Sequence, residues 1–285
     1  MKFLILGCNG MVGHMVSLYL KEMGYEVEGY ARKKSNYIHT IVGDARDSKL
    51  LEDIIRTGNY TNIVNCIGLL NESAENDRES AVYLNAYLPH FLEKITNGMR
   101  TQIIHISTDC VFSGSRGNYT ELDFPDGKSF YDRSKALGEL TNQKDVTLRM
   151  SVIGPDINEN GIGLINWFLK QKGSVNGYSN VFWTGLTTLQ LAKTIENVAN
   201  QGVNGLYNMV PEKKISKYNL LVLFNKYLRS DSIEIVKEEN YKIDKSLKRT
   251  NFERFTYKMP EYEQQIKELG EWMREHNWLY PQYKL

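Results

Sequence analysis

Tyr131 and Lys135 stand four residues apart in a segment with helical apolar spacing. Side chains at this separation lie on the same face of a helix, so the phenol and the ammonium can act on one group. A free tyrosine has a pKa of about 10, and a neighbouring cation lowers that pKa by stabilising the phenolate. The pair therefore suits proton exchange with a carbonyl or hydroxyl oxygen. By itself the spacing is also common on surface helices that have no such role.

A hydroxyl residue, Thr108, follows the apolar run 103–106 and precedes Tyr131 by 23 positions. In a parallel sheet the binding crevice lies at the carboxyl ends of the strands, which is where this pattern places Thr108. A hydroxyl there can hydrogen-bond the substrate oxygen that Tyr131 protonates. Lys135 can also donate to a ribose hydroxyl of a bound cofactor.

Three glycines, Gly7, Gly10 and Gly13, follow the apolar run 3–6 and open a helical pattern. Glycines in this context permit a tight turn, close approach of the backbone to a pyrophosphate, and close packing of strand and helix. The phosphate then meets the N–H groups of the first helix. Three ordinary loop glycines are the alternative, which the strand-to-helix position disfavours. The residues assigned to this contact are Gly7, Asn9, Gly10, Met11, Val12 and Gly13.

The second apolar run ends in three consecutive cations at 32–34, with no carboxylate at its tip. A carboxylate at that place usually holds the 2′-hydroxyl of NAD, whereas cations attract the 2′-phosphate of NADP. Arg32 and Lys33 therefore favour NADP(H), with NAD(H) as the alternative, unless the basic turn contacts only solvent. Asp44, next to Ala45, can accept from the adenine amino group or cap the following helix.

Alternating short apolar runs and longer helical patterns predict the elements that position these residues. The runs lie at 3–6, 27–30, 41–42, 63–67, 103–106 and 147–152, and helical spacing lies at 11–23, 48–56, 79–96 and 130–140. This alternation is typical of βαβ units on a parallel sheet. The sequence thus predicts an α/β fold with a doubly wound sheet, of the Rossmann type.

A break rich in glycine, proline and asparagine follows residue 154, and helical spacing returns at 164–169, 189–198, 218–228 and 262–273. We expect an NADP-binding domain over 1–153, to which 180–202 return, and a smaller substrate-binding region over 154–285. Residues 237–258 carry seven basic and four acidic side chains. This stretch is either a solvated loop face or part of an anion-binding site.

Composition excludes several classes of function. With 35 basic and 34 acidic residues the net charge is +1, which gives no general attraction to nucleic acid or to an anionic membrane. The three cysteines show no C-x-x-C spacing, and the histidines show no metal-ligand spacing, so reduced thiols, a cytoplasmic location and no metal are expected. No apolar stretch approaches the roughly 20 residues of a membrane span.

Together these motifs resemble the extended short-chain dehydrogenase/reductases, and within them the dTDP-4-dehydrorhamnose reductase-like group. The resemblance covers nearly the whole chain. Its specific segments are 7–13, 65–68, 84–86, 107–112, 131–139 and 148–149. It implies that Thr108, Tyr131 and Lys135 are the catalytic triad and that Asn85 is the family's helix asparagine near the active site. It also implies that Cys66, Ile67 and Gly68 line the cofactor, together with Asn85, Tyr131 and Lys135.

Two departures bear on the substrate. Family reductases commonly carry an aromatic residue at the position of Cys110, and segment 183–188 replaces a proline-containing turn. The related 4,6-dehydratases carry a glutamate where this chain has Cys110, so dehydration is disfavoured. Nucleotide-sugar epimerases with bound NAD keep the same triad and remain an alternative, as does a non-catalytic NADP-binding regulatory subunit.

The resemblance implies NADPH-dependent reduction of the 4-keto group of a nucleotide-linked 4-keto-6-deoxyhexose, for the sugars of cell-surface polysaccharides. The nucleotide sugar is then the expected partner, and a homodimer is compatible with the sequence. Substrate contacts are expected from Thr108, Asp109, Cys110, Val111, Asn166, Lys248 and Arg249.

Overall fold

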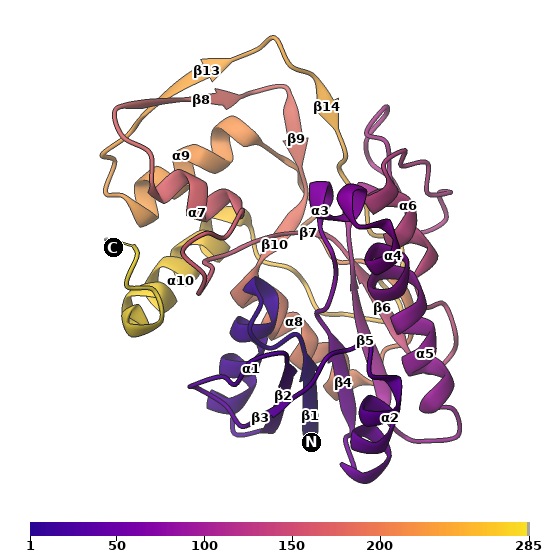
Figure 1. Ribbon diagram of the computed structural model, residues 1–285. Coiled ribbons are helices and arrows are strands. Elements are labelled where there is room, and N and C mark those ends of the chain that lie inside the picture. The colour runs from indigo at the N-terminus through magenta and orange to yellow at the C-terminus, as the bar shows by residue number, and fades with distance from the viewer. Residues whose placement is uncertain (284–285) are drawn as a thin grey trace.

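A seven-stranded parallel sheet lies at the centre of the computed structural model, which describes residues 1–283 (Figure 1). Its strands are β1 (Lys2–Leu6), β2 (Glu26–Ala31), β3 (Thr40–Val42), β4 (Asn62–Asn65), β5 (Gln102–Ser107), β6 (Val146–Arg149) and β11 (Gly205–Asn208). The order is β11-β6-β5-β4-β1-β2-β3, and every pair of neighbours is parallel. This arrangement confirms the predicted doubly wound fold. The strand order reverses between β1 and β4, which is where such sheets bind nucleotides.

Helices cover both faces of the sheet, and this explains why its strands are almost continuously apolar. Alternate side chains of β1 enter two different cores: Phe3 and Ile5 on one face, Leu4 and Leu6 on the other. The first face is covered by α1 (Met11–Glu22) and α8 (Thr188–Gln201), and the second by α2 (Ser48–Thr57) and α5 (Leu88–Ile95).

The helix predicted over 79–96 is interrupted. It consists of α4 (Arg78–Ala81), a π-helical turn η1 (Val82–Tyr87) and α5. Single π-helical turns occur mostly inside longer helices, frequently at functional sites. The carbonyl oxygen of Asn85, within this turn, would lie 1.9 Å from a Cβ placed on Gly138. Glycine at 138 therefore permits helix α6 (Phe130–Leu137) to end against the π turn.

The run predicted over 147–152 also divides, into β6 and β7 (Ser151–Ile153). After β7 the chain builds a smaller region that lies over the carboxyl ends of the sheet strands in Figure 1. Its elements are α7 (Leu164–Leu169), β8 (Ser174–Tyr178), β9 (Val181–Trp183), β10 (Gly185–Thr187), β12 (Ile215–Ser216), α9 (Lys217–Leu228), β13 (Glu234–Glu238), β14 (Ile243–Asp244) and α10 (Tyr262–Glu275). Between β10 and β12 the chain returns to the main sheet as α8 and β11, residues 188–208. The predicted return over 180–202 is thus displaced, because residues 181–187 form β9 and β10 outside the main sheet and the returning strand is β11.

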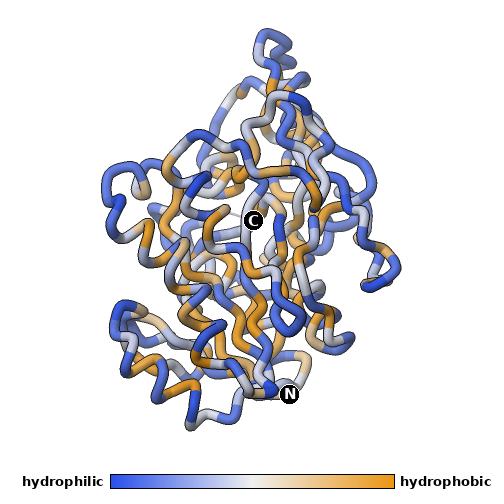
Figure 2. Tube along the Cα trace, turned by 90° about the vertical axis from the view of Figure 1, so that its right-hand side faces the viewer, coloured by the Kyte–Doolittle hydropathy of each residue, from blue (hydrophilic) through white to orange (hydrophobic). Residues whose placement is uncertain are grey.

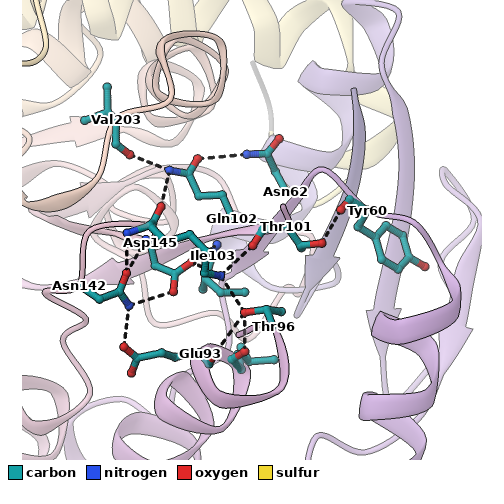
Figure 3. Close-up of polar contacts among 12 residues, drawn as sticks. Tyr60, Asn62, Glu93, Thr96, Thr101, Gln102, Ile103, Asn142, Asp145 and Val203 are labelled. Atoms are coloured by element: carbon teal, nitrogen blue, oxygen red, sulfur yellow. Dashed lines mark hydrogen bonds and ion pairs between the residues drawn. The ribbon is translucent and has the colours of Figure 1, made fainter. Parts of the chain in front are cut away.

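A buried polar network holds the amino ends of β5 and β6 (Figure 3). The fully buried Asp145 carboxylate accepts from the backbone N–H of Ile103 at 2.8 Å and from Asn142 Nδ2 at 2.9 Å. Gln102 Nε2 donates to the carbonyl of Val203 at 2.8 Å. These bonds tie the strands at one end, so that β5 and β6 reach the opposite end in a fixed register.

Apolar segments gather in the interior and hydrophilic segments occupy the outer loops (Figure 2). Within residues 1–283, none of the helices is both long and apolar enough to cross a membrane.

Candidate active site

The glycine turn after β1 is shaped by two close backbone approaches. Gly7 has φ +80°, and its N–H donates to the carbonyl of Tyr30 at 2.8 Å. Gly10 donates to the carbonyl of Gly7 at 3.0 Å, and α1 begins at the next residue. A Cβ on Gly13 would lie 2.1 Å from the same Gly7 oxygen. The turn predicted from the sequence therefore forms a backbone cradle at the N-terminus of α1. Side chains at positions 7 and 13 would fill this cradle.

Replacing Gly13 by Ala is expected to lower the free energy of unfolding by about 1–3 kcal/mol, because the added methyl group meets backbone atoms that move only with the whole turn. Gly10→Ala is the matched control, since its Cβ would lie 3.4 Å from the Gly7 oxygen. Thermal unfolding compares the two variants. Equal midpoints for both would contradict the close packing described here.

Exposed cations follow the second strand. The side chains of Arg32 and Lys33 are exposed, and neither forms an ion pair within residues 1–283. Asn9 Nδ2 donates to the carbonyl of Lys33 at 2.7 Å, which fastens this basic segment to the glycine turn. Two positive charges are therefore available beside the turn.

The segments that follow β3 and β4 carry the other residues predicted to contact the cofactor. The Asp44 carboxylate, beside buried Ala45, accepts from the N–H of Arg46 at 2.9 Å. The cap of α2 is Asp47, so the capping role considered for Asp44 is wrong. After β4, Ile67 Cγ1 would lie 3.0 Å from a Cβ on Gly7, which brings the loop of Cys66, Ile67 and Gly68 against the glycine turn.

Helix α6 presents Tyr131 and Lys135 to the end of β5. Its start is set by a capping box, in which Ser129 Oγ accepts from the N–H of Asp132 at 3.0 Å and Asp132 Oδ2 accepts from the N–H of Ser129 at 3.1 Å. With this start, residues four apart fall on the buried face. Tyr131 is 7% exposed and Lys135 is 4% exposed.

The Tyr131 phenol is held in its protonated form. Burial raises its pKa, and the neighbouring Cys110 acts in the same direction. Hydrogen bonding from Thr108 lowers the pKa and offsets part of this effect. The ring packs against Ala74 and Ala81. A buried, protonated phenol beside a threonine hydroxyl is the arrangement that an acid catalyst for a substrate oxygen requires.

Lys135 reaches from α6 to the carboxyl end of β5. Its Nζ donates to the carbonyl of Ile106 at 2.8 Å and lies 3.5 Å from His105 Nε2. Burial lowers the pKa of the lysine to about 8, against the opposing effect of Glu139. The ammonium and the neutral amine are therefore both accessible near neutral pH.

Thr108 directly follows β5 and caps the 3₁₀ turn η2 (Asp109–Val111). Its Oγ1 accepts from the N–H of Cys110 at 3.1 Å and lies 3.2 Å from Asp109 Oδ1. Burial raises the pKa of Asp109 and raises that of the Cys110 thiol to about 11. The thiol is thus protonated at neutral pH and does not replace the acid–base glutamate of a dehydratase.

Asn85, in the π-helical turn η1, links the loop that follows β4 to helix α6. Its side-chain oxygen accepts from the N–H of Leu69 at 2.8 Å, and its Nδ2 donates to the carbonyl of Leu69 at 2.9 Å and to Ser134 Oγ at 3.0 Å. The amide is fully buried. Asn85 therefore holds the loop after β4 and helix α6 in one relative position.

A buried ion pair links the strand ends beside the site. Arg149 Nη2 lies 2.5 Å from Glu139 Oε2, and Ser107 Oγ donates to Glu139 Oε1 at 2.6 Å. Arg149 also lies over the ring of Phe112. These contacts join the ends of β5 and β6 to the segment that follows α6, next to the predicted site residues.

Of the predicted substrate residues, three take part in other contacts and a fourth is exposed to solvent. Val111 is fully buried in the core, and Asn166 Nδ2 donates to the carbonyls of Glu159 and Gly161. Arg249 donates to the carbonyls of Phe255 and Tyr257, whereas the Lys248 side chain is exposed.

The structure does not bring Asn166, Lys248 and Arg249 into the group formed by Thr108, Tyr131 and Lys135. Asn166 and Arg249 shape loops of the smaller region, and the basic stretch contributes Lys245 instead, whose charge acts on Asp109 and Cys110.

Sequence reasoning missed Lys217, the first residue of α9. The charge of Lys217 acts to lower the pKa of the Asp109 carboxylate, and that carboxylate acts to raise the pKa of Lys217. The Lys217 Nζ lies 5.4 Å from the centroid of the Trp183 ring. Its pKa is lowered by burial. No local motif marks Lys217, because only the tertiary fold brings α9 to the end of β5.

Known proteins are similar to this chain over most of its length. A family model described as the RmlD substrate binding domain matches residues 1–275. A probable low-salt glycan biosynthesis reductase from Haloferax volcanii is 24% identical over 227 residues, 74% of this chain and 75% of that protein. Methionine adenosyltransferase 2 subunit beta from Xenopus tropicalis is 24% identical over 233 residues, 76% of this chain and 69% of that one.

Among solved structures, dTDP-4-dehydrorhamnose reductase from Bacillus anthracis, in complex with NADP, has a TM-score of 0.77. Its sequence is 18% identical, and the alignment covers 94% of this chain and 98% of that one. At this identity the likeness shows a shared fold.

Proposed function

This chain belongs to the RmlD substrate binding domain family, and on that premise we propose that it is an NADPH-dependent reductase of a nucleotide-linked 4-keto-6-deoxyhexose. The observation that carries the proposal is the meeting of Tyr131, Thr108 and Lys135 at the carboxyl end of β5, beside the glycine turn. The relatives named as reductases support the reaction class, and the NADP complex supports the cofactor.

The residues present fit NADPH. A glycine cradle that Cβ atoms would fill suits the pyrophosphate, and the exposed Arg32 and Lys33 suit a 2′-phosphate. When bound, the cofactor supplies a hydride for the keto carbon. Residues 1–153 and the returning segment 188–208 are proposed to hold it, and the remainder of the chain to hold the sugar nucleotide.

The side chains divide the remaining chemistry among them. Tyr131 transfers its phenolic proton to the substrate oxygen as negative charge develops there, and Thr108 donates a hydrogen bond to the same oxygen. Lys135, as the ammonium, stabilises the phenolate that remains and can donate to a ribose hydroxyl. Ala74 and Ala81 pack against the Tyr131 ring and shield that side of it from water during the proton transfer.

Stoichiometric oxidation of NADPH with a panel of 4-keto nucleotide sugars tests this proposal. A reductase consumes one NADPH for each hydroxyl formed. Conversion of a sugar without net oxidation would assign the chain to the epimerases. Binding of NADPH with no conversion of any sugar would favour a regulatory subunit, a role compatible with the relationship to methionine adenosyltransferase 2 subunit beta.

Replacing Arg32 and Lys33 together by Ser is expected to weaken NADPH binding about 10- to 100-fold, because the 2′-phosphate loses two charge-assisted partners. NADH binding should change little, since NADH lacks that phosphate. Lys94→Ser, on α5, is the control for the loss of a surface cation. Fluorescence titration measures both affinities, and equal losses for the two cofactors would contradict the assignment.

A further inference from the structure

His105 lies behind the catalytic lysine with both ring nitrogens in defined contacts. It is fully buried in β5, with Nδ1 3.2 Å from Asn65 Nδ2 and Nε2 3.5 Å from Lys135 Nζ. The proposed mechanism uses Lys135 and gives no role to His105. A fully buried imidazole facing a catalytic ammonium calls for a physical reason, since both groups can carry positive charge.

The backbone determines which ring nitrogen carries the proton. The N–H of Ile67 can only donate, and it donates to Asn65 Oδ1 at 3.2 Å. The amide nitrogen of Asn65 therefore faces His105 and donates to Nδ1, which must accept. The neutral ring then carries its proton on Nε2, directed at Lys135. Burial and the charge of Lys135 lower the pKa of His105 well below its usual value, so the ring stays neutral.

We propose that His105 is a positioning residue that presents its Nε2–H to Lys135 and thereby favours the neutral amine over the ammonium at this place. Two donors facing each other repel, whereas a neutral amine accepts a hydrogen bond from Nε2–H and still donates to the carbonyl of Ile106.

Other groups also act on Lys135. They are the Glu139 carboxylate beyond the end of α6 and the Cys66 thiol after β4, and the Tyr131 phenol lies one turn earlier in α6. Glu139 favours the ammonium, but its charge is shared with Arg149 and with the hydroxyl of Ser107. Cys66 is protonated, because burial raises its pKa to about 12. Among the described residues around Lys135, His105 is thus the polar side chain that disfavours the ammonium form.

The consequence is an upper pH limit for catalysis, and this step rests on the proposed function. The ammonium stabilises the Tyr131 phenolate, so turnover should fall as Lys135 loses its proton. Two variants remove the opposing N–H. His105→Phe keeps the ring volume, and Asn65→Asp can only accept, which moves the ring proton to Nδ1 and turns Nε2 into an acceptor for the ammonium.

The test is an NMR titration of the lysine side chains in the full chain without substrate, with the Lys135 signal assigned from Lys135→Met. The midpoint for Lys135 should rise by about one pH unit or more in His105→Phe and in Asn65→Asp, and stay unchanged in the control His276→Gln. An unchanged midpoint in both folded variants would overturn the role of His105.

The titration needs no sugar, so its result is independent of the proposed reaction. If the reductase assignment also holds, the alkaline limb of kcat should move upward by the same amount in both variants. A raised lysine midpoint with no turnover of any 4-keto sugar in the unmodified chain would retain the coupling and reject the reaction. Normal turnover with an unchanged lysine midpoint would reject the coupling alone.

Discussion

Replacing Tyr131 by Phe is expected to reduce turnover by about 10²- to 10⁴-fold, the usual contribution of a positioned acid. The phenol lies beside Thr108 and is the group that we propose as the proton donor to the substrate oxygen, and phenylalanine keeps the ring that packs on Ala74 and Ala81. NADPH affinity should stay within about twofold, because no part of the glycine turn changes. Steady-state kinetics and fluorescence titration measure the two effects.

Tyr25→Phe is the matched control for the loss of one phenol. Tyr25, between α1 and β2, donates to Glu196 of α8 at 3.1 Å, on the sheet face that α1 and α8 cover. Its variant should keep full turnover. Turnover of Tyr131→Phe close to that of the unmodified chain would remove Tyr131 from the mechanism.

Replacing Lys135 by Met is expected to abolish at least about 99% of turnover and, at the same time, to stabilise the fold. The buried ammonium costs free energy, as its lowered pKa of about 8 shows. Methionine fills a similar volume without a charge. After allowance for the lost bond to the carbonyl of Ile106, the gain in the free energy of unfolding should be about 1–3 kcal/mol at pH 7.

The pH dependence of this gain has a definite sign. The pKa of Lys135 is about 8 in the folded chain and 10.5 when exposed, so the unfolded chain binds more protons between these values. The free energy of unfolding of the unmodified protein therefore rises with pH through this window, because Lys135 loses its proton and the buried charge disappears. The advantage of Lys135→Met is complete below pH 8 and shrinks toward pH 10.5. Urea unfolding at pH 7 and pH 10 measures it, with Lys94→Met, at an exposed position of α5, as the surface control.

An equal free energy of unfolding for Lys135→Met and the unmodified chain at both pH values would contradict the buried charge. Loss of stability at pH 7 would show that the bond to the carbonyl of Ile106 outweighs the cost of burial. Retained turnover would show that the phenol functions without the lysine.

The sequence predicted the elements whose signals are local. The glycine turn and the buried strands depend on residues that are neighbours in the chain, and the i to i+4 spacing of Tyr131 and Lys135 follows from helix geometry alone. Thr108 could be assigned because a parallel sheet places every strand end at the same edge.

Features that depend on tertiary contacts were not predictable in the same way. The π-helical turn at Asn85 depends on how α6 ends at Gly138, 53 residues later in the chain. Lys217 reaches Asp109 only because the smaller region folds over the sheet. Arg249 was assigned to the substrate from its charge, but in the structure its guanidinium is buried and donates to backbone carbonyls.

A single-turnover reaction with NADPH deuterated at the transferable position of the nicotinamide, followed by mass spectrometry of the sugar, tests the central claim most directly. With a dTDP-linked 4-keto-6-deoxyhexose, we expect a product that carries one deuterium on C4, formed at a rate at least about 100-fold lower in Tyr131→Phe. An isomerised sugar without deuterium, or labelling that is equally fast in Tyr131→Phe, would contradict it.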